Sequence, residues 1–240
     1  MQTLESEAKK AMTRDQTLAE QIASRLRRDI LRGKLPPGTS VKERDNAAEL
    51  GVSRTPMREA IRILSKEGLI DLRPSRSPIV AQASFKEISD QTEVLIALET
   101  LSAQLACTHA TDSDLARLAG IVAHMDRHFD TTDPLDMFEI DMSFHTAIAE
   151  ASHNRPLAET HRAFLQRLWR VRYLAAVQRR NRARVVTEHT NILTALRARD
   201  PGAARAAIDD HLRNLADDIR NVIAQETQSD ATHAESAASA

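Results

Sequence analysis

Apolar residues recur at helical spacing along most of this 240-residue chain, and short groups of turn and cap residues separate the resulting segments. Only 3% of the residues are aromatic whereas 42% are hydrophobic, so the core must be built mainly from Leu, Ile, Val and Ala. Such residues suit helix-on-helix packing. From Phe85 onward only helices are expected, at 86–110, 114–129, 134–151, 156–178, 182–199 and 203–224. The sequence therefore predicts a mainly α-helical protein whose C-terminal part is an antiparallel helical bundle.

The N-terminal part combines helices with a hairpin. A first helix begins near Leu18 and ends at Gly33, and a short helix at 46–50 ends at Gly51. Ser53 is placed to cap the next helix, whose first turn contains Pro56. Two helices joined by a Gly-containing turn are typical of a helix-turn-helix. The segments "LIDLRP" and "PIVAQ" then predict two strands, which makes the whole a winged helix-turn-helix.

Charge and composition divide the chain into predicted regions. We expect a disordered N-terminus at 1–14, a winged helix-turn-helix DNA-binding domain at 15–83, a helical effector-binding and dimerisation domain at 84–224, and a disordered tail at 225–240. Residues 1–84 hold 16 Lys and Arg against 11 Asp and Glu, and the rest of the chain holds 17 against 23. A basic module joined to an acidic one is compatible with nucleic-acid binding and a separate second function.

The chain lacks the marks of an exported or membrane protein. Cys107 is the only cysteine, which excludes an internal disulfide framework. No segment has the continuous apolar character of a signal peptide or a membrane-spanning helix. A cytoplasmic location is therefore predicted.

The start of the helix after Gly51 carries the polar side chains that could contact DNA. In a helix-turn-helix the second helix lies in the major groove with its first residues on base edges. Arg54 and Arg58 can each engage guanine, and the hydroxyls of Ser53 and Thr55 can bind phosphate. The alternative is that both arginines are ordinary solvated side chains, paired with Glu59 or Glu67.

A longer block carries a family resemblance. The stretch "ILRGKLPPGTSVKERDNAAELGVSRTPMREAIRILSKEGLIDLRP" resembles the winged helix of the GntR family of bacterial transcription regulators. The resemblance implies operator contacts from Arg44, Ser53, Arg54, Thr55 and Arg58, with Arg76 and Ser77 at the tip of the wing. The chain departs from the family pattern at two positions, since Asn46 replaces the usual Leu and Ser77 replaces the usual Gly. The second departure bears on how closely the wing approaches the minor groove.

Four residues in the helical part could hold a metal. Asp141 and His145 are four apart on one predicted helix, so both project from the same face. His189 and His211 lie among apolar residues of two later helices. Three imidazoles and a carboxylate suit Zn(II), Ni(II) or Mn(II). The alternative is that the histidines are core residues; His161 is the substitute ligand if His189 does not bind.

The helical part also resembles a known domain. The pieces "ALETLSAQLA", "DMSFHTAIAEASHN" and "EHTNILTALRARDPGAARAAIDDHL" are similar to the FCD-type ligand-binding domain of the FadR subfamily. The resemblance implies a metal held by Asp141, His145, His189 and His211, with Asn154 near the pocket as a helix cap or a ligand contact. Leu95 stands where many members carry an effector-binding Arg, so a carboxylate effector needs another cation.

The arginine-rich segment 167–184 offers candidates for that cation, and we assign effector binding to Arg170 and Arg172. The two cannot share a helix face, so the alternative is that most of these arginines are solvated.

Together these observations predict a homodimeric transcription regulator that binds a pseudopalindromic DNA operator and acts as a repressor. A carboxylate bound at the metal site would change the spacing of its DNA-binding domains. We expect no enzyme activity. Two alternatives remain: a metal-dependent enzyme that uses the Asp/His site, because open metal positions can activate water, and a regulator with a metal-free apolar effector pocket.

Overall fold

The computed structural model describes residues 16–225, and the chain divides into two compact units between Gln82 and Ala83. The tails for which disorder was predicted, 1–14 and 225–240, lie outside these residues except for Gln225, which is helical. No helix in the described part combines the length and apolar character required to cross a bilayer.

The first unit is a winged helix-turn-helix, as predicted. It contains α2 (Leu18–Leu31), α3 (Glu43–Leu50), α4 (Arg54–Lys66), β1 (Ile70–Asp71) and β2 (Ile79–Val80). Thr17 and Glu20 form a capping box at the start of α2, because each satisfies a backbone N–H of the other. Gly51 ends α3 with a φ of 66°, which glycine adopts without strain.

A single core holds this unit together. Its buried side chains come from all three helices, the two strands and the adjoining loops, with Met57, Ile61 and Leu64 of α4 on the inner face. β1 pairs with β2 in antiparallel register, Ile70 opposite Val80. The strands are two residues long, shorter than the alternating segments in the sequence suggested.

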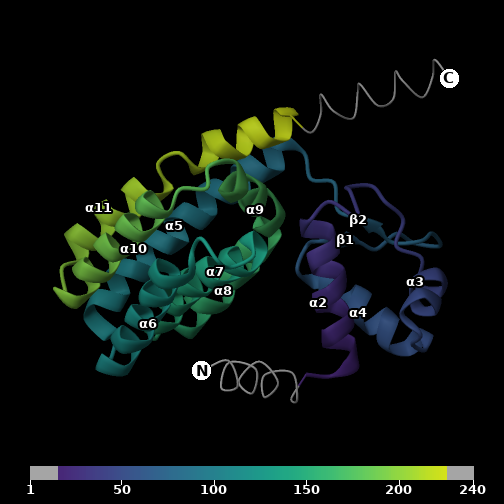
Figure 1. The fold of residues 1–240 in the computed structure, drawn as a ribbon, viewed down its shortest axis with the longest axis horizontal. Coiled ribbons are helices and arrows are strands. Elements are labelled where there is room, and N and C mark those ends of the chain that lie inside the picture. The colour runs from purple at the N-terminus through teal and green to yellow at the C-terminus, as the bar shows by residue number, and fades with distance from the viewer. Residues whose placement is uncertain (1–15, 226–240) are drawn as a thin grey trace. The chain divides into compact units, whose positions relative to one another are not determined.

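The second unit is the predicted helical bundle (Figure 1). Its helices are α5 (Phe85–His109), α6 (Asp112–His128), α7 (Pro134–Ala151), α8 (Arg155–Arg167), α9 (Trp169–Gln178), α10 (Arg182–Arg197) and α11 (Pro201–Leu212), and residues 215–225 are also helical. The long helix α5 packs against α7, α8, α10 and α11, so most of the bundle is built around it. Breaks fall at cap residues such as Asp133 and Asp200, whose carboxylates accept hydrogen bonds from the first backbone N–H groups of α7 and α11.

Two helices predicted as continuous are interrupted. The segment predicted as 156–178 is divided at Leu168 into α8 and α9, and the segment predicted as 203–224 is divided at 213–214. Leu165, Leu168 and Arg172 are all buried and keep helical spacing across the first break. Apolar periodicity therefore continues through it, and no Pro or Gly marks the position.

Candidate metal centre and DNA-contacting surface

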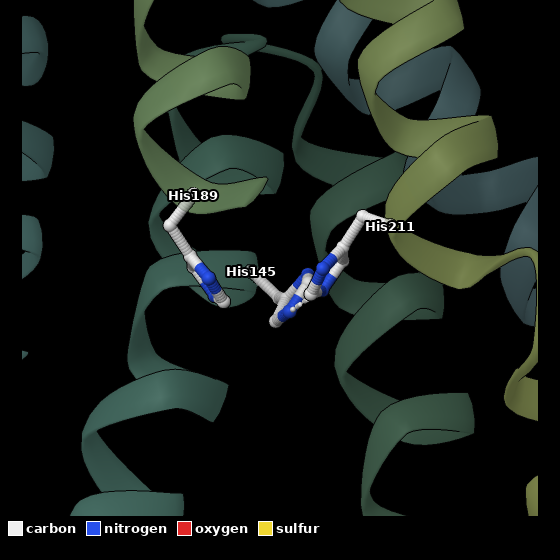
Figure 2. Close-up of side chains that lie close together, drawn as sticks. All are labelled: His145, His189 and His211. Atoms are coloured by element: carbon white, nitrogen blue, oxygen red, sulfur yellow. Dashed lines mark hydrogen bonds between the residues drawn. The ribbon is translucent and has the colours of Figure 1, made fainter. Parts of the chain in front are cut away.

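The structure brings together the four residues predicted as metal ligands. Asp141 and His145 lie one turn apart on α7, His189 is on α10 and His211 is on α11. Figure 2 shows the three imidazole rings converging from these helices. One ring nitrogen from each histidine lies within 4.8 Å of the others, a spacing compatible with a shared ion.

The carboxylate of Asp141 completes the group. Its Oδ1 lies 2.6 Å from Nε2 of His189 and 3.6 Å from Nε2 of His145. Nε2 of His211 lies 3.2 Å from Nε2 of His145. Three Nε2 atoms and one carboxylate oxygen therefore surround a common point.

A second set of contacts fixes the orientation of each ring. Nδ1 of His145 lies 2.7 Å from Oε2 of Glu99, and Nδ1 of His211 lies 2.9 Å from Oε2 of Glu188. Nδ1 of His189 lies 2.7 Å from the backbone carbonyl oxygen of Val185. Because carbonyl and carboxylate oxygens accept hydrogen bonds, Nδ1 of His189 and Nδ1 of His211 are placed to carry the proton, whereas Nδ1 of His145 approaches Glu99 as an ion pair without hydrogen-bond geometry. In a ring protonated on Nδ1 alone, the Nε2 lone pair points to the common point, which is the arrangement in which histidine binds a metal.

Burial and charge shift the pKa values of this group in opposite directions. Burial alone would lower the pKa of His145, but the charge of Glu99 and the nearby carboxylate of Asp141 outweigh it and raise the pKa to about 9. Burial lowers the pKa of His211 to about 4, and the neighbouring His189 and His145 add to this shift against the opposing contact with Glu188. Burial raises the pKa of Asp141, but the charge of His189 and the nearby His145 hold it well below its usual range. The carboxylate is thus ionised and ready to accept a cation.

Glu99 and Glu188 were not predicted as parts of the site. Glu99 is a buried carboxylate on α5 whose Oε1 accepts a 2.9 Å hydrogen bond from Nη1 of Arg172. Burial raises its pKa, but the charges of His145 and Arg172 outweigh this effect and hold the pKa well below the usual range. The sequence offers one signal for Glu99: it is the only acidic residue in the apolar stretch "VLIALETLSAQLA", and it lies one helical turn after the buried Leu95.

The predicted effector residues differ in their placement. Arg172 is buried and lines a cavity beside the histidines, whereas Arg170 is not among the lining residues. Asn154 caps α8 by accepting a hydrogen bond from the backbone N–H of Leu157, and it lies in a separate surface depression. His161, the substitute ligand, is fully buried, and its Nε2 lies 3.7 Å from Glu99 rather than in the histidine group.

The cavity beside the histidines has a volume of about 110 Å³. α7, α9, α10 and the chain around 211–218 contribute most of its wall, and Met125 and Phe129 close it from α6 and its C-terminal cap. Asp141, His189 and His211 belong to the same wall, so the histidine group opens into this cavity.

In the first unit, the residues predicted to contact DNA lie at the exposed start of α4. Ser53, Arg54, Thr55 and Arg58 are all exposed, as is Arg44 on α3. Ser53 is the N-cap residue, but its side chain makes no capping hydrogen bond. The hydroxyl is thus not engaged with the helix end that it precedes.

The partner of the two arginines is Glu43, not Glu59 or Glu67. Arg58 donates to Glu43 with a shortest distance of 3.0 Å, and Arg54 approaches the same carboxylate at 4.0 Å. Glu67 instead pairs with Arg27 at 2.7 Å in a largely buried contact. Through these exposed ion pairs with Glu43, both arginine side chains are held near the N-terminal end of α4.

A side chain bridges the turn between β1 and β2, which forms the wing. The guanidinium of Arg73 donates two hydrogen bonds, of 2.9 and 2.7 Å, to the backbone carbonyl oxygen of Ser77. Among the non-glycine residues of this turn, the left-handed conformation falls on Ser75, with a φ of 55°, and not on Ser77. Serine at position 77 therefore introduces no backbone strain, and Arg76 is exposed at the tip.

Comparisons with known proteins agree with both units. Residues 18–80 match the family of bacterial regulatory proteins called the gntR family, and residues 90–214 match the FCD domain. The HTH-type transcriptional repressor RspR of Escherichia coli (strain K12) is 28% identical over 207 residues, which cover 86% of this chain and 91% of RspR.

Two solved structures share the fold. A GntR transcriptional regulator from Rhodococcus sp. RHA1 superposes with a TM-score of 0.68 at 23% identity, covering 85% of this chain and 97% of that one. McbR/YncC of E. coli superposes with a TM-score of 0.66 at 22% identity, covering 89% and 99%. Together, the winged helix, the helical bundle and the two domain matches show that the chain belongs to the GntR family of bacterial transcription regulators and carries an FCD domain.

Proposed function

We propose that this regulator is a repressor that binds a pseudopalindromic operator as a homodimer and responds to a small organic acid at a metal-containing pocket. The convergence of three Nε2 atoms and the Asp141 carboxylate, each ring oriented through its Nδ1, is the observation that carries the effector half of this proposal. A regulator that acts on DNA would work in the cytoplasm of a bacterium.

The proposed metal is a divalent transition ion, Zn, Ni or Mn, held by Asp141, His145, His189 and His211. Four protein ligands leave open positions on an ion that accepts five or six, and carboxylate oxygen suits those positions. The metal would supply a Lewis-acidic anchor for the effector. The cavity gives a small molecule access to this point, since Asp141, His189 and His211 line it.

The proposed effector contacts are Arg172, Arg170 and Asn154. Arg172 has the strongest support because it lines the cavity and is buried, so its charge is not screened by bulk water. Asn154 and Arg170 would require an indirect role, through the start of α8 and through α9 respectively.

The proposed operator contacts come from two surfaces of the winged helix. Arg54 and Arg58 would bind bases, with Ser53, Thr55 and Arg44 on phosphates, and Arg76 and Ser77 would approach the minor groove. One winged helix makes few base contacts, so two half-sites bound by a symmetric dimer would multiply affinity. The proposal that the protein represses transcription is supported by its similarity to RspR, which is named as a transcriptional repressor.

Selection from a random duplex library tests the DNA half, because such a library assumes no operator sequence. The full chain should enrich two half-sites related by an inverted repeat, and Arg54→Ala should lose the enrichment. An exposed control, Arg205→Ala on α11, should keep it. Enrichment of a single half-site, or an unchanged motif with Arg54→Ala, would contradict the proposal.

Elemental analysis of the purified full chain tests the effector half. About one metal per chain is expected, and His145→Ala and His189→Ala should each remove most of it. His153→Ala, an exposed histidine paired with Asp114, serves as the control and should retain the metal. Turnover of candidate acids by the metal-loaded protein would instead support the metal-dependent enzyme.

A further inference from the structure

The exposed side of α4 carries a row of cations. Arg54, Arg58, Arg62 and Lys66 follow one another at intervals of four residues, and all of them are exposed. Residues four apart lie on the same face of a helix, so the row runs from the first residue of α4 to the last. The proposed operator contacts use only the first half of this row, Arg54 and Arg58. The second half has no assigned role.

The two halves of the row differ in their ion pairs. The first two cations share the carboxylate of Glu43. Among the residues that the structure describes, no acidic side chain pairs with Arg62 or Lys66, and Glu59, three residues before Arg62, does not approach it as an ion pair. Unpaired exposed cations are neutralised by mobile ions, which a polyanion such as DNA can replace. Arg62 and Lys66 can therefore meet a phosphate without breaking a contact within the protein.

The position along the helix decides which of these two cations reaches the DNA backbone. In the proposed complex the start of α4 lies in the major groove with Arg54 at the base edges. At a rise of about 1.5 Å per residue, Arg62 lies about 12 Å and Lys66 about 18 Å further along the helix axis. The major groove is about 8.5 Å deep, so a helix that enters it end-on holds Arg62 about 3–4 Å above the rim and Lys66 about 10 Å above it. An inclined helix brings both closer but keeps their order.

The direction of the side chains favours Arg62 further. Helical side chains point back toward the N-terminus of their helix, which is the end that enters the groove. The long side chain of Arg62 can therefore close the remaining few ångströms, and its guanidinium can bind phosphate oxygens through two hydrogen bonds. Lys66 lies about one Debye length from the rim at 0.1 M salt, so its attraction to the backbone is largely screened.

We propose that Arg62 binds a backbone phosphate at the rim of the major groove, one helical turn beyond the last proposed base contact of α4. It acts as a positioning residue, and Lys66 stays outside the interface. This inference rests on the proposed placement of α4 and adds a contact to it. Phosphate contacts fix the register of a protein on DNA but carry no direct sequence information, so Arg62 contributes equally to binding of the operator and of any other duplex.

The salt dependence of DNA binding tests this role. Fluorescence anisotropy of the full chain is measured with two labelled duplexes, the operator enriched from the random library and a duplex of random sequence. Arg62→Ala should weaken binding to both by the same factor and should reduce the slope of log K against log salt concentration by about 0.9, the contribution of one phosphate contact. Between about 50 and 200 mM salt, the parent should then lose three- to fourfold more affinity than the variant.

Three variants separate a phosphate contact from general charge. Arg62→Lys keeps the charge and should restore most of the slope. Lys66→Ala removes the next cation of the row and should change the slope by well under half as much as Arg62→Ala. Arg25→Ala removes an exposed cation from α2, which packs against the opposite, buried face of α4, and should leave the slope unchanged.

Three outcomes would overturn the proposal: a slope unchanged by Arg62→Ala, an equal change in Arg25→Ala, or a loss of affinity confined to the operator, which would make Arg62 a base-reading residue. Arg54→Ala, measured with the same two duplexes, separates this failure from that of the proposed function. It should abolish the preference for the operator, and a preference that survives would reject the placement of α4 itself. Loss of preference in Arg54→Ala beside an unchanged slope in Arg62→Ala would reject only the contact from Arg62.

Discussion

Nε2 of His145 faces Nε2 of His211 at 3.2 Å, although Nδ1 of each ring is held against a glutamate. With both protons on Nδ1, two lone pairs would oppose each other at this distance. A cation between the rings relieves that repulsion, either as a proton on one nitrogen or as a metal ion shared with Asp141 and His189. The two glutamates therefore matter as much as the histidines for what this point can hold.

The first prediction concerns Glu99, which orients His145. Glu99→Gln removes the charge that holds the Nδ1 proton and should lower metal affinity by about 10- to 100-fold, the usual effect of losing such a partner. Competition with a chelator of known affinity measures the change. Glu150→Gln, which removes a partly exposed carboxylate paired with Arg117 and Arg162, should leave metal affinity unchanged. Equal affinities for the two variants would refute the role given to Glu99.

The second prediction concerns Glu43, the shared partner of Arg54 and Arg58. In the proposed operator complex these arginines exchange Glu43 for DNA, so Glu43→Gln should tighten binding to any duplex. It should also steepen the dependence of log K on log salt concentration by roughly one unit, because one more cation is available to phosphate. Fluorescence anisotropy with a random duplex at several salt concentrations measures both effects. Glu49→Gln on the same helix is the control, and an identical change in that variant would point to general charge rather than to this ion pair.

The third prediction uses two glycines with opposite backbone requirements. Gly51 has a φ of 66° at the end of α3, so Gly51→Ala should lower the free energy of unfolding by about 1 kcal/mol. Gly120 lies in an exposed turn of α6, and a Cβ added there would meet no atom within 4 Å, so Gly120→Ala should raise the free energy of unfolding by about 0.5–1 kcal/mol. Urea unfolding of the two variants beside the parent measures both. A gain from Gly51→Ala would contradict the conformation described here.

The fourth prediction concerns pH and the capping box of α6. The hydroxyl and the backbone N–H of Thr111 donate to Asp114, and with His153 they lower the pKa of Asp114 to about 2. A carboxyl whose pKa falls on folding stabilises the folded state above its unfolded pKa, near 3.8, and loses this contribution as the pH falls toward 2. Asp114→Asn should therefore be less stable than the parent at pH 6, and the difference should shrink between pH 4 and pH 2. Urea midpoints across this range measure it, and a difference independent of pH would contradict the assignment.

The winged helix and the bundle could be predicted because their signals are local. Helical spacing of Leu and Ile residues, the glycine after α3 and the Asp and Thr caps each act within a few residues. The grouping of Asp141 with His145 was equally local. Bringing His189 and His211 to them required the resemblance to a known domain, because spacing along separate helices does not fix how the helices pack.

Other parts of the site depend on contacts between distant segments. Glu99 and Arg172 are 73 residues apart in the sequence and meet only because α5 and α9 pack into one bundle. The pairing of Arg58 with Glu43, in place of Glu59 or Glu67, depends on how α3 meets α4. The break at Leu168 was also invisible, because the buried face continues across it.

That break separates two tasks within the regulator. The proposed metal ligands are on α7, α10 and α11, whereas α9 begins after Leu168 and contributes Arg172, Ala175 and Ala176 to the cavity wall without any metal ligand. Substitutions at Ala175 or Ala176, which lie in the cavity wall away from the Arg172–Glu99 pair, could change which molecule is recognised while the proposed metal centre stays intact. Ligand preference and the proposed metal binding would then be open to separate selection, so a lineage could acquire a new effector without rebuilding the proposed metal centre.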